Sequence, residues 1–399
     1  MERSYTDLGW LKEWTEVRAE IVEPGFELRP IIPPATTLYD TQLGWIEDDG
    51  SIVITDIGGQ GEPGWNPEKG HGSIFKLHPD NRVEPIVPYG NTGRAMIMST
   101  VKSPPNFGEY SNRPFPLGQL RPGRQGAHNT HAVFWVPPGA SWVEHYVVVP
   151  DSGSINGGKS GALMGPGWGE PGTPEDGFMF VVSMFNCTMY KVTSTRQIWP
   201  YVVGDTENAG IQFMPRWIYR APQSWGQHAG KLICEGVANH SFSSPAPKPG
   251  EPPLVEKIVH FVVDDQGEGQ KAKLTQIDAS GLLPYEFPDW PSTMANRYRG
   301  AVAPKGFGAF GGQQFVVDMG SVNLMQTSTM PEEALPYDAA IYRIDEKGER
   351  HLFVKNLQAG HPQVKFHAGR LLIGAIGKSY STGDFHYPDG SLMEIVYTG

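Results

Sequence analysis

Histidine, aspartate and asparagine residues recur beside short strand-like runs in this sequence of 399 residues, and hydrolytic and metal-dependent sites use these residue types. The densest group is the segment AHNTH, which contains His128, Asn129 and His131. Two histidines three residues apart on a loop can bind zinc, iron or copper, although such a pair also arises by chance. A set of aspartate, asparagine and carbonyl oxygens would instead suit calcium. This group by itself leaves the chemistry open.

Motifs that would assign a reaction directly are missing. The sequence contains no GxSxG, no P-loop and no HExxH. The glycine-rich run KGFGAFGG joins two strand-like runs and opens no helix, so it predicts no phosphate-binding loop. The chemistry must therefore come from residues that the fold brings together.

The elements that would position these residues are short strands in a repeated phrase. The clearest copies are Ser51–Pro88 and Gln314–Asn356, in which strand-like runs flank a charged turn. Further copies of the first strand begin at His145, Phe178, Lys231 and Arg370. Repeating a small antiparallel sheet around an axis protects the strand edges. The sequence thus predicts an all-β chain folded as a six-bladed β-propeller, with five or seven blades as alternatives because the spacing is uneven.

We expect a single propeller domain over residues 1–399, with long loop insertions near residues 92–176 and 242–254. In the first of these regions, the run AMIMSTV either opens the second blade or belongs to the insertion. Apolar residues at helical spacing predict a short N-terminal helix over Tyr5–Arg18. The C-terminal run SLMEIVYTG predicts a strand, which either pairs with an N-terminal strand such as Phe26–Ile31 or remains an edge strand.

Composition excludes several classes of protein. The formal net charge is −11, which argues against a nucleic-acid partner, and an aromatic content of 11% argues against disorder. No run of apolar residues is long enough to span a membrane, and Met1–Glu20 shows no apolar leader. The two cysteines, Cys187 and Cys234, predict no disulfide framework. We expect a cytoplasmic protein whose partner is a small-molecule substrate, and the oligomeric state stays open.

In a propeller, the innermost strand of every blade begins on one side, which we call the entry side. Polar residues on this side can converge near the axis. We predict that Tyr39, Asp56, Asp151, Arg297 and Asp318 bind the substrate there. His131 or His240 is the predicted general base, because histidine titrates near neutral pH. By contrast, His71 lies beside an outer hairpin, and we expect it at the surface.

The phrases WIEDDGSIVITDIGG with GSIFKL, and AAIYRIDEKGERHLFV, resemble blades of the six-bladed propeller superfamily of gluconolactonases, senescence marker protein and strictosidine synthase. The resemblance implies a divalent ion at the axis. The matching ligand positions are Asp40, Asn129, Asn186 and His361, and we predict His128, next to Asn129 in the sequence, as a further metal ligand. Calcium is the ion that we expect, with zinc, manganese or iron as alternatives because histidines are more numerous here.

These observations suggest a metal-assisted hydrolase of a small-molecule lactone or ester, with its site at the propeller axis. Two alternatives stay open. One is a propeller lyase, isomerase or metal-dependent oxygenase that uses axial histidines. The other is a binding propeller without enzymatic activity.

Overall fold

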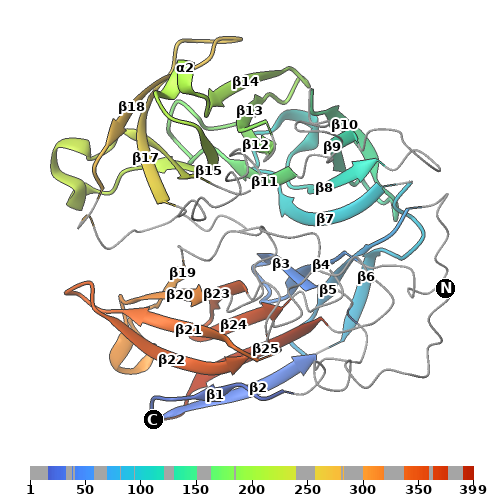
Figure 1. Ribbon diagram of the computed structural model, residues 1–399. Coiled ribbons are helices and arrows are strands. Elements are labelled where there is room, and N and C mark those ends of the chain that lie inside the picture. Colours follow the sequence, from blue (N-terminus) through green and yellow to red (C-terminus); the bar gives the residue numbers. More distant parts are fainter. Residues whose placement is uncertain are drawn as a thin grey trace, which may run out of the picture. The chain divides into compact units, whose positions relative to one another are not determined.

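The computed structural model describes residues 17–32, 38, 41–57, 70–80, 82–93, 95–120, 130–150, 163–183, 186–239, 257–279, 282, 300–318, 337–358, 363–375 and 390–399. Within these ranges the strands form five sheets of four strands and one of five (Figure 1). Neighbouring strands pair antiparallel throughout, for example β3 with β4 and β4 with β5. The fold is a six-bladed β-propeller, as the sequence predicts.

The chain forms two compact units, and each contains three blades. Unit 1 comprises residues 1–66, 71–90 and 294–399. Its blade 1 consists of β3 (Thr41–Ile46), β4 (Ile52–Asp56), β5 (Ser73–Leu77) and β6 (Val83–Val87). Blade 5 consists of β19 (Gly300–Val302), β20 (Gln314–Asp318), β21 (Ala339–Ile344), β22 (Arg350–Leu357) and the added strand β1 (Glu20–Ile21). Blade 6 consists of β23 (Gln363–His367), β24 (Arg370–Ala375), β25 (Ser391–Tyr397) and β2 (Phe26–Ile32).

Unit 2 comprises residues 67–70 and 91–293. Blade 2 consists of β7 (Ala95–Lys102), β8 (Pro114–Leu120), β9 (Thr130–Trp135) and β10 (Glu144–Val148). Blade 3 consists of β11 (Leu163–Trp168), β12 (Met179–Ser183), β13 (Thr188–Val192) and β14 (Ile198–Val203). Blade 4 consists of β15 (Phe213–Arg220), β16 (Leu232–Ala238), β17 (Lys257–Asp264) and β18 (Lys273–Ile277). The described helices are short: η1 (Gly108–Tyr110), α2 (Thr206–Ala209), η2 (Gln223–His228) and η3 (Gly308–Phe310).

Blade 2 corrects one part of the sequence prediction. The run AMIMSTV opens this blade as β7, so it is not part of an insertion. The run that begins at His145 is β10, the outermost strand, whereas the second strand of the blade is β8. The sequence of β8, PFPLGQL, contains two prolines and a glycine, which have low strand propensity, so its pattern does not predict a strand. Its core residues Phe115 and Leu117 are nevertheless fully buried. Burial of these side chains outweighs the low strand propensity of the run.

Of the two alternatives for the C-terminal strand, the structure shows the pairing with an N-terminal strand. Strand β2 pairs antiparallel with β25, with Leu28 opposite Ile395. Because β2 is the outermost strand of blade 6, its Pro30 removes no hydrogen bond from the interior of the sheet. Pro85 in β6 and Pro200 in β14 occupy outermost strands in the same way.

The core of each unit lies between neighbouring blades, and two similar hairpins contribute to it. The segments SPPNFGEY and APKGFGAF each join the first two strands of a blade. In each segment a fully buried phenylalanine, Phe107 or Phe307, precedes a glycine with positive φ, Gly108 (58°) or Gly308 (54°). A side chain is disfavoured at such φ values, so glycine permits the turn that directs the ring inward. The run KGFGAFGG therefore has a packing role as a hairpin.

Some of the sequence predictions concern residues that the structure does not describe. The predicted N-terminal helix lies outside the described residues except for Val17 and Arg18, which are not helical. The region near 242–254 also lies outside them, and the single-domain arrangement stays a prediction. None of the described helices has the length and apolar character needed to cross a membrane.

Candidate functional site

A group of buried polar side chains lies at the entry end of blade 1, where its innermost strand begins. Thr41 in β3 is opposite Asp56 in β4, which is opposite Ser73 in β5. Gln42 is opposite Thr55 in the next row of the same sheet. Relative exposure is 1% for Gln42 and 0% for the other four residues. We call these five residues, Thr41, Gln42, Thr55, Asp56 and Ser73, the blade 1 polar end.

These residues are buried because their strands are covered on both faces. All five residues of β4 are buried, and so are the first four of β3. A polar atom without a partner in such a place costs about 1–3 kcal/mol. Four such atoms of the blade 1 polar end lack a hydrogen-bond partner among the described residues: the Thr41 hydroxyl on the sheet face of Asp56, and the Thr55 hydroxyl and both amide atoms of Gln42 on the opposite face. The blade 1 polar end can therefore donate hydrogen bonds to a ligand and accept them from it.

Asp56 supplies a carboxylate to this group. The Tyr89 hydroxyl donates a short hydrogen bond to Asp56 Oδ2. Tyr89 is only half-buried, and its ring packs edge-on against Phe75 with centroids 5.4 Å apart. The phenol therefore links a buried carboxylate to a partly exposed position. Such a pair can pass a proton.

Two further side chains complete the surroundings of Asp56. The Ser73 hydroxyl donates to the carbonyl of Val87 at 2.6 Å. His71 is 3% exposed, with Nδ1 3.1 Å from the carbonyl oxygen of Ile57. The expectation that His71 lies at the surface is wrong, because the chain beside β5 is covered where it leaves the sheet.

Blade 6 adds a second buried amide. Gln363 in β23 is 1% exposed, and its Oε1 accepts a hydrogen bond from the backbone N–H of Leu43 at 3.0 Å. Its Nε2 has no partner within the described part of the chain. Gly374, opposite Gln363 in the sheet, allows this close approach, since a Cβ there would lie 3.1 Å from Leu43 Cγ. The entry ends of blades 1 and 6 thus meet, and both contribute neutral hydrogen-bonding groups.

His131 lies at the entry end of blade 2, but on its third strand. It is opposite Gln119 of β8 and is fully buried. The strand that follows AHNTH is β9, the third strand of blade 2, because β7 and β8 precede it in the sheet. The predicted role of His131 as a general base is untested.

Asn186 lies two residues before β13, and a hydrogen bond to Tyr190 fixes the orientation of its side-chain amide. Nδ2 donates to Tyr190 Oη at 3.1 Å, and Tyr190 Oη donates to the carbonyl of Pro150 at 2.7 Å. This arrangement turns the amide oxygen of Asn186 away from Tyr190.

Asp318 ends β20, and its carboxylate lies 2.9 Å from Arg350 Nη2. Both side chains are exposed, at 41% and 52%, so this ion pair contributes little to stability. The predicted role of Asp318 in substrate binding stays a prediction. The other predicted site residues lie outside the described residues: Tyr39, Asp40, His128, Asn129, Asp151, His240, Arg297 and His361.

One group within the described residues has metal-ligating atoms close together. Atoms of Asp345, Glu349 and His351 lie within 4.8 Å of one another on the hairpin between β21 and β22. A hydrogen bond from His351 at 2.9 Å, and further ones from the backbone N–H groups of Glu349 and Lys347, lower the pKa of Asp345 to about 2. The group thus forms a turn capped by Asp345. It lies at the end of blade 5 opposite the entry end.

Gln42, Tyr89 and Gln363 are not among the site residues predicted from the sequence. A signal existed for Gln42, because the run TQLGWI places two polar residues at the start of an otherwise apolar strand. Tyr89 and Gln363 carried no such signal, since their partners Asp56 and Leu43 are 33 and 320 residues away.

Comparison with known proteins places this geometry in a known fold. No family model and no curated protein sequence matches the chain. Its structure resembles that of a mutant α-L-arabinofuranosidase Arb93A from Fusarium graminearum, in complex with an iminosugar inhibitor. The TM-score is 0.53 at 12% identity, over 92% of this chain and 97% of that one. The structure of the GH93 α-L-arabinofuranosidase of Fusarium graminearum with arabinobiose is also similar. Its TM-score is 0.52 at 13% identity, over 93% of this chain and 97% of that one.

The likeness shows the fold alone: a six-bladed β-propeller. More distant solved structures include the soluble aldose sugar dehydrogenase of Escherichia coli, with a TM-score of 0.45 at 10% identity, over 93% of this chain and 99% of that one. Another is a protein provisionally named a gluconolactonase, with a TM-score of 0.44 at 8% identity, over 94% of each chain. The six-bladed propeller fold that the sequence resemblance implies is confirmed by the arrangement of the sheets and by the likeness to the arabinofuranosidase.

Proposed function

We propose that this chain is a hydrolase that acts on a small-molecule lactone or ester at the blade 1 polar end. The observation that carries the proposal is the hydrogen bond from Tyr89 to Asp56, beside the buried Thr41 hydroxyl, which has no hydrogen-bond partner among the described residues. A carboxylate can act through Tyr89 as the base in ester hydrolysis, and a neutral hydrogen-bond donor beside it can stabilise the developing oxyanion.

The chemistry assigns a role to each group. Water adds to the carbonyl carbon of the substrate, while its proton passes to Tyr89 and the phenolic proton passes to Asp56. The hydroxyl of Thr41, whose side chain lies on the same face of the sheet as that of Asp56, donates to the substrate oxygen on which negative charge develops. The ester C–O bond then breaks, and the proton returns from Asp56 through Tyr89 to the departing alkoxide. The products are an acid and an alcohol, joined in one molecule when the substrate is a lactone.

The similar structures support a hydroxyl-bearing substrate. The Fusarium arabinofuranosidase is a hydrolase and was solved with arabinobiose. Neutral amide and hydroxyl groups, such as those of Gln42 and Gln363, suit the hydroxyls of such a molecule.

A divalent ion is part of the proposal. Calcium is favoured, with zinc, manganese or iron as alternatives, and Asp40, Asn129, Asn186, His128 and His361 are the proposed ligands. Of these five proposed ligands, only Asn186 is among the described residues. Its amide oxygen points away from Tyr190, and an amide oxygen is a suitable ligand for calcium. When bound, such an ion would polarise the carbonyl and lower the pKa of a coordinated water.

A substrate panel tests the proposed reaction. Purified protein is incubated with aldonolactones, simple aliphatic lactones, p-nitrophenyl acetate and p-nitrophenyl arabinofuranoside. We expect hydrolysis of a lactone or an ester above the uncatalysed rate. Hydrolysis of the arabinofuranoside alone would replace this proposal with a glycosidase. No turnover of any substrate would favour a binding propeller.

Metal analysis tests the ion separately. We expect the purified protein to contain a stoichiometric divalent ion, measured by plasma mass spectrometry, and chelation to lower kcat. A preparation that remains fully active with no bound metal would remove the ion from the proposal and leave the roles of Asp56 and Tyr89 intact.

A further inference from the structure

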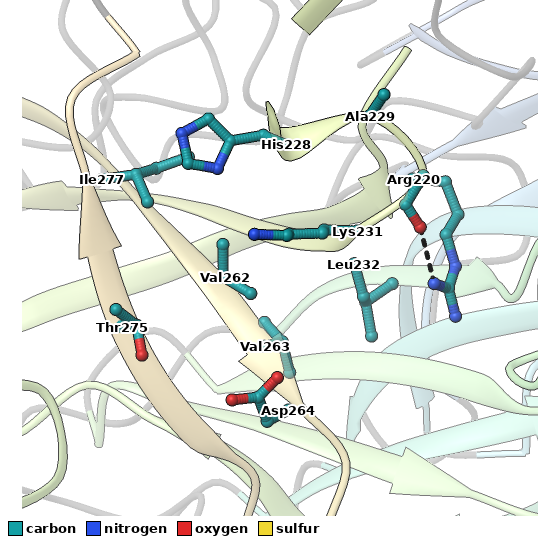
Figure 2. Close-up of a pocket in the computed structure, with 11 residues that line it drawn as sticks. Arg220, His228, Ala229, Lys231, Leu232, Val262, Val263, Asp264, Thr275 and Ile277 are labelled. Atoms are coloured by element: carbon teal, nitrogen blue, oxygen red, sulfur yellow. Dashed lines mark hydrogen bonds between the residues drawn. The ribbon is translucent and has the colours of Figure 1, made fainter. Parts of the chain in front are cut away.

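A cavity lies on one face of blade 4 in unit 2, and none of its lining residues belongs to the blade 1 polar end. Its volume is about 540 Å³, which is in the size range of small-molecule sites. Its lining comes from the hairpin between β15 and β16, and from β17 and β18 (Figure 2). All of these elements belong to one sheet and its hairpin, so blade 4 alone forms the cavity.

The floor of the cavity is apolar at its centre. Val262 is opposite Thr275 in the antiparallel register of β17 and β18. Side chains two residues apart in a strand share a face, so Asp264 lies beside Val262, and Ile277 lies beside Thr275. The floor therefore offers Val262 and Ile277 to a carbon chain, with Asp264 and Thr275 as its polar groups (Figure 2).

The wall of the cavity carries basic side chains on a rigid hairpin. His228 ends η2, and the N–H of Lys231 donates to the carbonyl of His228 at 3.0 Å. Arg220 Nη1 donates to the carbonyl of Gly230 at 2.8 Å, which holds the hairpin against β15. The guanidinium of Arg220 also binds Glu175 through two N–H groups, at 3.0 and 2.7 Å. The charge of Arg220 is therefore compensated, and the hairpin is held in place before any ligand binds.

Lys231 and Asp264 are charged groups of opposite sign that line the same cavity. Within the described ranges, neither side chain forms an ion pair or a hydrogen bond. Figure 2 shows Lys231 on the hairpin side and Asp264 at the far end of the floor. An anionic group of a ligand would be attracted to Lys231, with His228 as a second donor. A cationic group would be attracted to Asp264, with Thr275 as a second acceptor.

We propose that this cavity binds a small zwitterionic molecule. Its acid group lies at Lys231 and His228, its amine lies at Asp264 and Thr275, and its carbon chain lies over Val262 and Ile277. The site is distinct from the hydrolytic site, so the proposal does not depend on the proposed reaction.

Binding of simple zwitterions tests this inference. The probes are γ-aminobutyrate and ε-aminocaproate, and their one-charge counterparts are caproate and hexylamine. Affinities are measured by isothermal titration calorimetry. We expect a zwitterion to bind more tightly than either counterpart. Lys231→Gln and Asp264→Asn should each weaken zwitterion binding roughly tenfold, because each removes one charged hydrogen bond.

The counterparts and two control variants make the result specific. Lys231→Gln should weaken the binding of caproate but not that of hexylamine. Asp264→Asn should weaken the binding of hexylamine but not that of caproate. The controls Lys257→Gln and Glu268→Gln remove exposed charges of unit 2 that do not line the cavity, and they should leave affinity unchanged. No binding of any zwitterion, or binding that is equal in all four variants, would overturn the inference. Retained binding in the variants also shows that they are folded.

Discussion

Asp56→Asn should lower kcat/KM for lactone or ester hydrolysis roughly a hundredfold or more, because the variant cannot accept the proton that Tyr89 passes on. Asn has nearly the same shape as Asp, so the buried position opposite Thr41 and Ser73 is still filled. Tyr89→Phe should cause a loss of similar size, because it keeps the packing against Phe75 but removes the hydroxyl. Steady-state kinetics on the best substrate of the panel measures both effects.

The double variant and a matched control make this prediction sharper. If the two residues act as one relay, the variant with both changes should be no slower than either single variant. Asp49→Asn is the control, because Asp49 lies at the opposite end of blade 1 and caps the N–H of Ser51 at 2.9 Å. Its kcat/KM should stay unchanged. Full activity in both Asp56→Asn and Tyr89→Phe would exclude the relay, provided that circular dichroism shows both to be folded.

Arg220→Met should lower the free energy of unfolding by about 3 kcal/mol, because it leaves a buried carboxylate without its partner. The Glu175 side chain is only 4% exposed, whereas that of Arg220 is 25% exposed. Glu175 belongs to the hairpin between β11 and β12, and Arg220 ends β15. The pair therefore joins blade 3 to blade 4, and both blades should lose stability. Urea unfolding followed by tryptophan fluorescence measures the change.

A second variant separates the unpaired charge from the loss of packing. Glu175→Gln combined with Arg220→Met removes both charges, so it should be more stable than Arg220→Met alone. Arg29→Met is the surface control, since Arg29 and its partner Glu27 are each about half exposed, and it should not change stability measurably. If Arg220→Met were as stable as the unaltered protein, the pair would not hold the two blades together.

The strands of this fold were largely predictable because they depend on short-range patterns. The alternation in SIVITD and QFVVD identifies β4 and β20, and the charged turn in IYRIDEKGERHLF identifies the hairpin of β21 and β22. Prediction failed where long-range burial outweighed local propensity. Strand β8 contains two prolines and a glycine, and only its packing in blade 2 makes it a strand.

The sequence by itself determined the all-β class and favoured six blades, and it left the pairing of β2 with β25 as one of two alternatives. The all-β class and the repeated blades follow from the period of apolar residues and from turn residues, which act over a few positions. Only the tertiary structure decided which polar groups are buried together. Tyr89 reaches Asp56 across a blade, and Gln363 reaches Leu43 from the other end of the chain. The reason is physical: strand register and blade packing bring these groups together, and neither is encoded in the spacing of residues along the chain.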